Sequence, residues 1–342
     1  MFASHTPVLP SGSWILVTGV SGFIGSHIAD QLLSFGYRVR GTSRDNVKNA
    51  WVTELFETKY GKGKFELHEV PDITNESAFL PILEGVSGVV HAASDMSFGP
   101  DPNEIIPPTI ASATAIFNAA AKMDNVKRFV YTSSCASAAS PKPDTWSAIK
   151  SDTWNDEAVE QAWTPPPYGP ERGFVVYAAS KTESERQLWK LYEQRKPGFA
   201  FNTVLPSMNI GKSLSLEHQG HPSTSGLVQA VFQGDHATVQ SAHQYFYIDV
   251  QDNAQLHLAA LLHPDVKSER VFAYAAPYTW RGIQKIIQSI YPTKTFGPDI
   301  PDVVEDRSLI VSAPRAESLL KEMGRDGWTS LEESIKMNTE DL

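Results

Sequence analysis

A tyrosine and a lysine four residues apart, Tyr177 and Lys181, are the pair of side chains in this sequence best suited to acid–base chemistry. Residues at this spacing share one face of a helix, so the phenol and the ammonium would be neighbours. A phenol can protonate the oxygen that gains charge when a carbonyl group is reduced. Because a free tyrosine has a pKa of about 10, we expect the Lys181 ammonium to lower it, and a shift of about three units takes about 4 kcal/mol.

The spacing alone is not specific, because Tyr60 with Lys64 and Tyr192 with Lys196 repeat it. The first of these pairs lies in a stretch broken by two glycines, where no helix is expected to align the side chains. The second ends a charged segment just before a Pro-Gly pair, which is typical of a solvated helix end. Tyr177 instead follows an apolar run and begins a predicted helix. Context therefore singles out the third pair.

Two serines, Ser133 and Ser134, follow a predicted strand over residues 128–132. A hydroxyl at the end of a strand can donate a hydrogen bond to a substrate oxygen and stabilise the charge that develops there. The residues alone leave both serines open for this role.

A glycine-rich segment near the N-terminus predicts a site for a nucleotide pyrophosphate. It follows an apolar strand over residues 14–17, opens a helical pattern, and precedes a second strand over residues 37–41. Glycines allow a tight turn and a close approach of the backbone to phosphates, and the helix N-terminus supplies free N–H groups. The cofactor-binding candidates in this segment are Gly19, Ser21, Gly22, Phe23, Ile24 and Gly25.

The end of the second strand indicates which dinucleotide is bound. Sites for NAD place an acidic residue there, where it accepts a hydrogen bond from the ribose 2′-hydroxyl. Residues 37–44 contain no acid. Arg44 is instead placed to pair with a 2′-phosphate, and Lys48 follows one helical turn later. Arginine forms strong, charge-assisted hydrogen bonds with phosphate. We therefore expect NADPH (NADP+) in preference to NADH.

Strand-like apolar runs alternate with helical patterns through the first two thirds of the chain. This alternation predicts the α/β class, with a Rossmann-type doubly wound parallel sheet. The other predicted strands cover residues 65–70, 88–92, 201–205 and 245–250, and the predicted helices cover residues 76–83, 110–122 and 178–193. Near the C-terminus, Ser330 with Glu333 indicates a capping box for the last helix.

The rhythm of strands and helices breaks after Pro206. We therefore expect a dinucleotide-binding domain over residues 1–206 and 243–264. A smaller, interleaved C-terminal substrate-binding domain is expected over residues 207–242 and 265–342, with 245–250 as a lone strand.

Open α/β sheets bind ligands at the carboxyl ends of their strands. The residues just after the strands are therefore further cofactor candidates, namely Asp72, Ile73, Ala92, Ala93, Ser94, Thr132, Pro206 and Ser207. Candidates for the substrate pocket are Met96, Phe98, Phe174 and Gln244. A mostly apolar lining with one amide suits an aryl or alkyl carbonyl compound.

Composition argues against several classes of protein. The 342 residues carry a net charge of −10 without clustered basic residues, so no nucleic-acid partner is expected. No apolar run reaches the roughly 18 residues that a membrane span needs, and no signal peptide is expected. The single cysteine, Cys135, fits a reducing, cytoplasmic location. His218 and His221 have no further ligand candidates around them, so no metal site is expected.

Taken together, the motifs resemble the extended short-chain dehydrogenase/reductase superfamily, and within it the branch of dihydroflavonol reductases and fungal aldehyde and carbonyl reductases. Nearly the whole chain shares the resemblance, which is carried by residues 17–25, 40–44, 91–94, 127–130, 177–181 and 324–335. It implies that Ser134 orients the carbonyl group, Tyr177 is the acid and base, and Lys181 binds the cofactor ribose. The implied reaction is NADPH-dependent reduction of aldehydes, ketones or keto esters to alcohols. We expect a small-molecule substrate and a monomer or homodimer.

One position departs from the family pattern. Ala115 stands where relatives often carry an asparagine, and Asn118 falls one turn later, which puts a proton relay through that side chain in doubt. Two alternatives stay open: a nucleotide-sugar epimerase or dehydratase, which shares the Tyr/Lys pair, and a regulator that binds NADPH without catalysis. The acidic net charge disfavours a doubly anionic sugar nucleotide.

Overall fold

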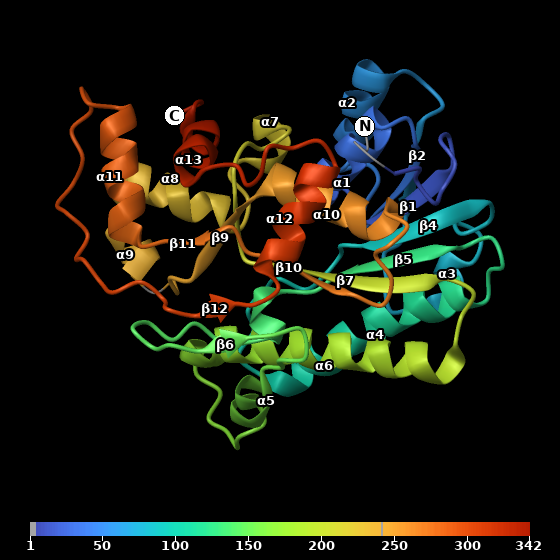
Figure 1. Ribbon diagram of the computed structural model, residues 1–342, viewed down its shortest axis with the longest axis horizontal. Helices are drawn as coiled ribbons and strands as arrows, with labels where there is room; N and C mark the ends of the chain where they lie inside the picture. The colour runs from blue at the N-terminus through green and yellow to red at the C-terminus, as the bar shows by residue number, and fades with distance from the viewer. Residues whose placement is uncertain (1–4, 241) are drawn as a thin grey trace.

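The computed structural model describes residues 5–240 and 242–342, and its centre is a seven-stranded parallel sheet (Figure 1). The strands are β1 Trp14–Thr18, β2 Arg38–Ser43, β3 Phe65–Glu69, β4 Val86–His91, β5 Arg128–Thr132, β7 Ala200–Pro206 and β10 Arg270–Ala273. They follow the order β10-β7-β5-β4-β1-β2-β3. Strands β1 to β3 are thus added toward one edge of the sheet and the later strands toward the other, so the switch point lies between β1 and β4. The expected doubly wound Rossmann-type fold is confirmed. Sheets of this kind bind dinucleotides at the switch point.

Strand β10 forms one edge of this sheet, although the sequence analysis assigns it to the substrate-binding domain. It pairs in parallel with β7, from Arg270 beside Thr203 to Ala273 beside Pro206. The strand is hard to recognise because it has only four residues and begins with a charged residue that is buried. The predicted domain boundary is therefore wrong at this strand.

Helices cover both faces of the sheet, as Figure 1 shows. One face carries α1 Phe23–Ser34, α2 Trp51–Tyr60, α10 Val250–Leu262 and α12 Ala313–Glu322; the other carries α3 Glu76–Phe79, α4 Pro102–Ala121 and α6 Gly173–Arg195, with α5 Asp156–Ala162 packed on α6. Alternate residues of β1 serve the two faces: Ile15 and Val17 pack on the first and Leu16 on the second. Within the described ranges, no helix has both the length and the apolar composition to cross a membrane.

The two long helices on the second face begin earlier than the sequence pattern predicts. α4 begins at Pro102 instead of residue 110, because Asp101 caps it and two prolines within it obscure the helical pattern. α6 begins at Gly173, so Tyr177 lies in its second turn. α3 is a single turn that ends at Phe79, earlier than predicted.

A smaller region lies beyond the carboxyl ends of the strands. Its sheets are β11-β9-β8, with β8 Met208–Ile210, β9 Phe246–Asp249 and β11 Ala276–Pro277, and β12-β6, with β6 Ala148–Ile149 and β12 Leu309–Ile310. Its helices are α7 Leu216–Gln219, α8 Ser225–Gln233, α9 His236–Gln240, α11 Trp280–Ile290 and α13 Leu331–Thr339, and the 3-10 turns of the chain are η1 Cys135–Ser137 and η2 Pro170–Arg172. The strand predicted at residues 245–250 as a lone strand is β9, and it is instead the central strand of a three-stranded sheet outside the large sheet. The cap of the last helix is confirmed, since Ser330 Oγ accepts from Glu333 N at 3.2 Å.

The last residue of β9, Asp249, is a buried acid whose protonation contributes to stability. Its side chain is fully buried, accepts a hydrogen bond from Gln251 N at the start of α10, and accepts another from Ser334 Oγ. Burial, followed by the charge of Asp252, raises the pKa of Asp249 to about 6. The folded protein therefore holds this proton more tightly than the unfolded chain. Stability contributed by this group is highest below its unfolded pKa and falls as pH rises through about 6.

The Asp249→Asn variant should therefore be more stable than the wild type at about pH 8, by up to about 3 kcal/mol for a shift of about two units. About half of the difference should remain near pH 5, and it should largely disappear near pH 4, close to the unfolded pKa. The reason is that asparagine resembles the protonated acid and still caps a helix well. Urea unfolding of both proteins at about pH 8 and about pH 4 measures the effect. A difference that is the same at both would contradict the prediction.

Candidate active site

Tyr177 and Ser134 meet at the carboxyl end of β5. Tyr177 lies half-buried in α6, while Ser134 is 6% exposed and caps the turn η1, which packs against that helix. The Ser134 hydroxyl lies close enough to the phenol to favour its ionised form. Ser134 Oγ also accepts from Ala136 N at 3.2 Å, which fixes its orientation. A phenol and a serine hydroxyl are thus held side by side.

The neighbouring serine is engaged elsewhere. Ser133 Oγ lies 2.7 Å from Glu185 Oε2 and 3.0 Å from Ser137 Oγ, so it is held beneath the turn. Ser133 is also buried, at 4% exposure. Of the two serines that the residues alone left open, only Ser134 has its hydroxyl beside Tyr177.

Lys181 lies one turn after Tyr177 and is 3% exposed. Its Nζ donates to Thr132 O at 3.1 Å and lies 5.3 Å from the centre of the Tyr131 ring. The Thr132 side chain in turn bonds His257 Nε2 at 2.9 Å. The ammonium is therefore fixed against the end of β5, where the predicted cofactor residue Thr132 also lies.

The pKa of Tyr177 shifts in the direction opposite to the one expected. Burial raises it to about 12, and the nearby Ser134 hydroxyl opposes this only in part. Burial also lowers the pKa of Lys181 to about 8, against the effect of the Glu185 charge. The expected net lowering of the Tyr177 pKa is therefore wrong, because the loss of water around the phenolate outweighs the effects that favour it. Tyr177 keeps its proton at neutral pH.

The glycine-rich turn between β1 and α1 packs against the end of β4. Gly19 has a φ of +65°, and a Cβ on it would lie 3.0 Å from the Ala93 backbone. A Cβ on Gly25 would lie 2.2 Å from Gly19 O, so only glycine allows this turn. Thr18 Oγ1 joins the two strand ends by accepting from Ala92 N and Ala93 N at 3.1 Å each. The rest of the turn and the start of α1 are formed by the predicted residues Ser21, Gly22, Phe23 and Ile24.

Two cations are available at the end of β2. Arg44 directly follows that strand and Lys48 comes one turn later, and both are exposed. In the described ranges, no residue forms an ion pair or a hydrogen bond with either side chain. Further along the same edge, Asp72 Oδ1 accepts from Thr74 N and Thr74 Oγ1, which lowers its pKa.

The remaining cofactor candidates also lie near this edge of the sheet. Ile73 and Ser94 are half-buried, in the segments after β3 and β4. Pro206 ends β7, and Ser207 N donates to Ala273 O at 3.1 Å. The Ser207 hydroxyl donates to Phe246 O at 2.6 Å, so it ties the large sheet to the smaller one.

Aromatic side chains surround the phenol. The ring centre of Phe98 lies 4.9 Å from that of Tyr177, and the ring of Phe174 lies 6.3 Å away. His243, which is not among the predicted site residues, packs at a tilt against Phe174, with ring centres 4.4 Å apart. No motif marks this histidine, because it lies in a loop far from α6 in the sequence.

The two other substrate candidates have different surroundings. Gln244 Oε1 accepts from Trp280 N at 2.8 Å, so this amide oxygen is occupied at the start of α11. The side chain of Met96 is 46% exposed, in the same loop as Phe98. Of the four substrate candidates, Phe98 and Phe174 are therefore the ones in ring contact with Tyr177.

A protein-family model matches most of the length of this chain. Residues 15–274 match the family described as the NAD dependent epimerase/dehydratase family. The chain belongs to this family. The expected place among the extended short-chain dehydrogenases/reductases, in the dihydroflavonol-reductase-like branch, is also confirmed.

Two relatives and one solved structure illustrate the similarity. Aldehyde reductase 2 of Sporidiobolus salmonicolor is 40% identical over 332 residues, which is 96% of each chain. Ketoreductase adrE of Penicillium roqueforti is 40% identical over 347 residues, or 98% of each chain. The crystal structure of Gre2 from Candida albicans in complex with NADPH is 23% identical, with a TM-score of 0.80 over 96% of this chain and 98% of that chain, and shares the fold.

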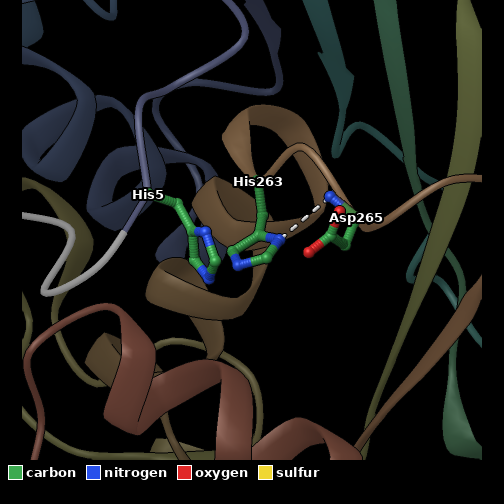
Figure 2. A group of neighbouring side chains, drawn as sticks. All are labelled: His5, His263 and Asp265. Atoms are coloured by element: carbon green, nitrogen blue, oxygen red, sulfur yellow. Dashed lines mark hydrogen bonds between the residues drawn. The ribbon is translucent and has the colours of Figure 1, made fainter.

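In this member of the family, a group of possible metal ligands lies at the end of α10 (Figure 2). His5, His263 and Asp265 lie close together there. Asp265 N donates to His263 Nδ1 at 3.1 Å, and His263 Nε2 lies 2.8 Å from Glu322 Oε2. Both ring nitrogens of His263 already have partners, so the group is poorly suited to a metal ion. That the protein has no metal site stays a prediction.

Ala115, which replaces the asparagine of relatives, lines a hollow of about 520 Å³ between α4 and α6. Asn118 and Trp163 also line it, but none of the predicted catalytic residues does. This hollow is therefore separate from the site around Tyr177.

Proposed function

We propose that this protein is a carbonyl reductase that uses NADPH to convert aldehydes, ketones or keto esters into alcohols. The observation that carries the proposal is the meeting of Tyr177, Ser134 and Lys181 at the edge of the sheet where the glycine-rich turn lies. Two relatives at 40% identity over nearly their whole length, named aldehyde reductase 2 and ketoreductase adrE, support the same reaction.

The residues at the sheet edge fit a dinucleotide. The tight turn at Gly19 and Gly25 would let the backbone approach a pyrophosphate at the start of α1, which has no side-chain cap. Arg44 and Lys48 are free to bind the 2′-phosphate. The Lys181 ammonium, beside Thr132, would bind the nicotinamide ribose. Bound NADPH would supply the hydride that reduces the carbonyl carbon.

The chain itself would orient the substrate and supply the proton. The Ser134 hydroxyl donates a hydrogen bond to the carbonyl oxygen and stabilises the charge that develops there. Tyr177, whose pKa is about 12, donates its proton to the same oxygen, since a phenol is a stronger acid than the alcohol that forms. The Lys181 ammonium then stabilises the phenolate that is left. Phe98 and Phe174 keep an apolar substrate against the phenol and exclude water.

The preference for NADPH can be tested at Arg44. The Arg44→Ala variant should raise KM for NADPH about 10- to 100-fold, because a charge-assisted hydrogen bond contributes about 1.5–3 kcal/mol. KM for NADH should change less than about threefold. Arg38→Ala is a matched control on the same strand, since that side chain donates to Gly12 O. Equal efficiency of the wild type with NADPH and NADH would contradict the preference.

The proposed reaction is tested with a panel of aldehydes, ketones and keto esters, with NADPH consumption followed by absorbance. The proposal predicts one molecule of alcohol for each NADPH consumed. A parallel panel of UDP- and GDP-sugars tests the epimerase and dehydratase alternative. Turnover of sugar nucleotides with tightly retained cofactor, and none of simple carbonyl compounds, would overturn the proposal.

A further inference from the structure

A completely buried carboxylate, Glu185, lies directly beneath the proposed site. It is on α6 two turns after Tyr177 and one turn after Lys181, so the three residues share one face of the helix. Its exposure is 0%. Nothing in the proposed reaction requires this acid, and a buried charge is retained only where it is paired and hydrogen-bonded.

Five side chains from several elements surround the carboxylate. Oε2 lies 2.7 Å from both Ser133 Oγ and Ser137 Oγ and 3.2 Å from Arg270 Nη2, and Oε1 lies 2.8 Å from both Thr203 Oγ1 and Arg270 Nε and 3.3 Å from Trp189 Nε1. Burial alone would raise the pKa of Glu185, but Arg270 and the serine hydroxyls hold it below its ordinary value. Glu185 is therefore an anion whose acceptor positions are well filled.

The two serines connect this anion to Ser134. Ser133 immediately precedes Ser134, and Ser137 Oγ lies 2.8 Å from Ser134 O as well as near Glu185. The residues on either side of the proposed carbonyl-binding hydroxyl are thus anchored to the helix that carries Tyr177. A loss of this anchor would let Ser134 move relative to the phenol, and small displacements of such groups are costly for catalysis.

Arg270 fixes the anion from the opposite side. Its Nη1 donates to Ser151 O and Thr153 O at 2.8 and 2.7 Å, and its guanidinium lies 3.9 Å from the centre of the Trp154 ring. Arg270 comes from β10, the strand that the sequence analysis assigned to the other domain. The ion pair therefore joins the edge of the sheet to the turn that carries Ser134.

We infer that Glu185 is a positioning residue, which anchors residues 133–137 and hence the Ser134 hydroxyl against α6 and places a negative charge one turn from Lys181. This inference rests on the proposed function. The other titratable or charged groups that face Lys181 are His91 on β4, Tyr131 on β5 and Tyr177 on α6, with His257 of α10 reached through Thr132. Glu185 is the only anion among them in the described part of the chain, so it favours the ammonium form.

The Glu185→Gln variant tests the inference in the full-length protein. We expect kcat for carbonyl reduction to fall about 10- to 100-fold, as for other losses of orientation, with KM for NADPH within about threefold of the wild type. The loss of activity at high pH should move to lower pH, because Lys181 loses its anion. A purely structural role would not shift this profile.

A second measurement does not require turnover. Cys135 is the only cysteine and lies next to Ser134. Loosening of residues 133–137 should therefore raise the rate at which an alkylating reagent labels it, by about tenfold or more. If the wild type reduces no carbonyl compound, the proposed function fails, while the labelling rate still decides whether Glu185 anchors the turn.

Two further variants control for folding. Asp252→Asn removes another acid of 0% exposure, on α10, and should change neither the pH profile nor the labelling of Cys135. Where Glu185→Gln leaves Arg270 unpaired and unfolds the protein, the double variant Glu185→Gln, Arg270→Met removes both charges, a change that proteins often tolerate. The inference would be overturned if Glu185→Gln, or the double variant, is folded and keeps the wild-type kcat, pH profile and labelling rate.

Discussion

The Tyr177→Phe variant is expected to reduce carbonyl compounds about a thousandfold more slowly than the wild type, in line with the loss of a general acid. Phenylalanine keeps the ring and its contacts with Phe98 and Phe174, whose ring centres lie 4.9 and 6.3 Å away. Only the proton donor beside Ser134 is lost. Steady-state kinetics should therefore show a fall in kcat, with NADPH affinity measured by fluorescence within about threefold of the wild type.

A second tyrosine on the same helix gives a matched control. Tyr192 is also followed four residues later by a lysine, but its hydroxyl lies 3.5 Å from Ser268 Oγ, away from the proposed site. Tyr192→Phe should keep full activity. If Tyr177→Phe retains more than about a tenth of the wild-type kcat, Tyr177 is not the acid.

The sequence was sufficient to predict the sheet and the place of the site, because both follow from repeating local patterns. The apolar strands alternate with helices, and parallel strands end at one edge, so residues after different strands meet there. The close contact of Gly19 with Ala93 follows from this rule. The choice of Tyr177 over Tyr60 and Tyr192 also depended only on local context.

Features that depend on three-dimensional surroundings could not be predicted in this way. Ser133 and Ser134 are identical in type and adjacent, and only the position of Glu185 distinguishes their hydroxyls. The sign of the Tyr177 pKa shift depends on how much water is excluded, which no spacing encodes. β10 was missed because its first residue, Arg270, is charged, and its burial makes sense only once its partner is known.

The burial that raises the pKa of the phenol also limits the pH range in which the neighbouring lysine can act. Lys181 has a pKa of about 8, lowered by burial. Its ammonium form stabilises the phenolate, so the active form is the protonated one. Wild-type kcat/KM for reduction should therefore be constant below about pH 7 and fall as pH rises through about 8.

The Lys181→Met variant should lower kcat about 10²- to 10³-fold, as expected when a charge that stabilises the transition state is removed. Methionine fills the space of the lysine stem, but no cation remains beside Thr132 O. KM for NADPH should also rise, because the contact with the ribose is lost. The residual activity should no longer fall through about pH 8, since the titrating group is absent.

Lys196→Met is the matched control, because that lysine also follows a tyrosine of α6 by four residues but is exposed at the helix end. It should leave both kcat and the pH profile unchanged. The measurement is kcat/KM between about pH 6 and pH 10 for the three proteins. A fall in activity near pH 8 that persists in Lys181→Met would assign that titration to another group, and His257 is excluded because burial lowers its pKa to about 4. The ammonium of Lys181 would then have no part in the acid–base step.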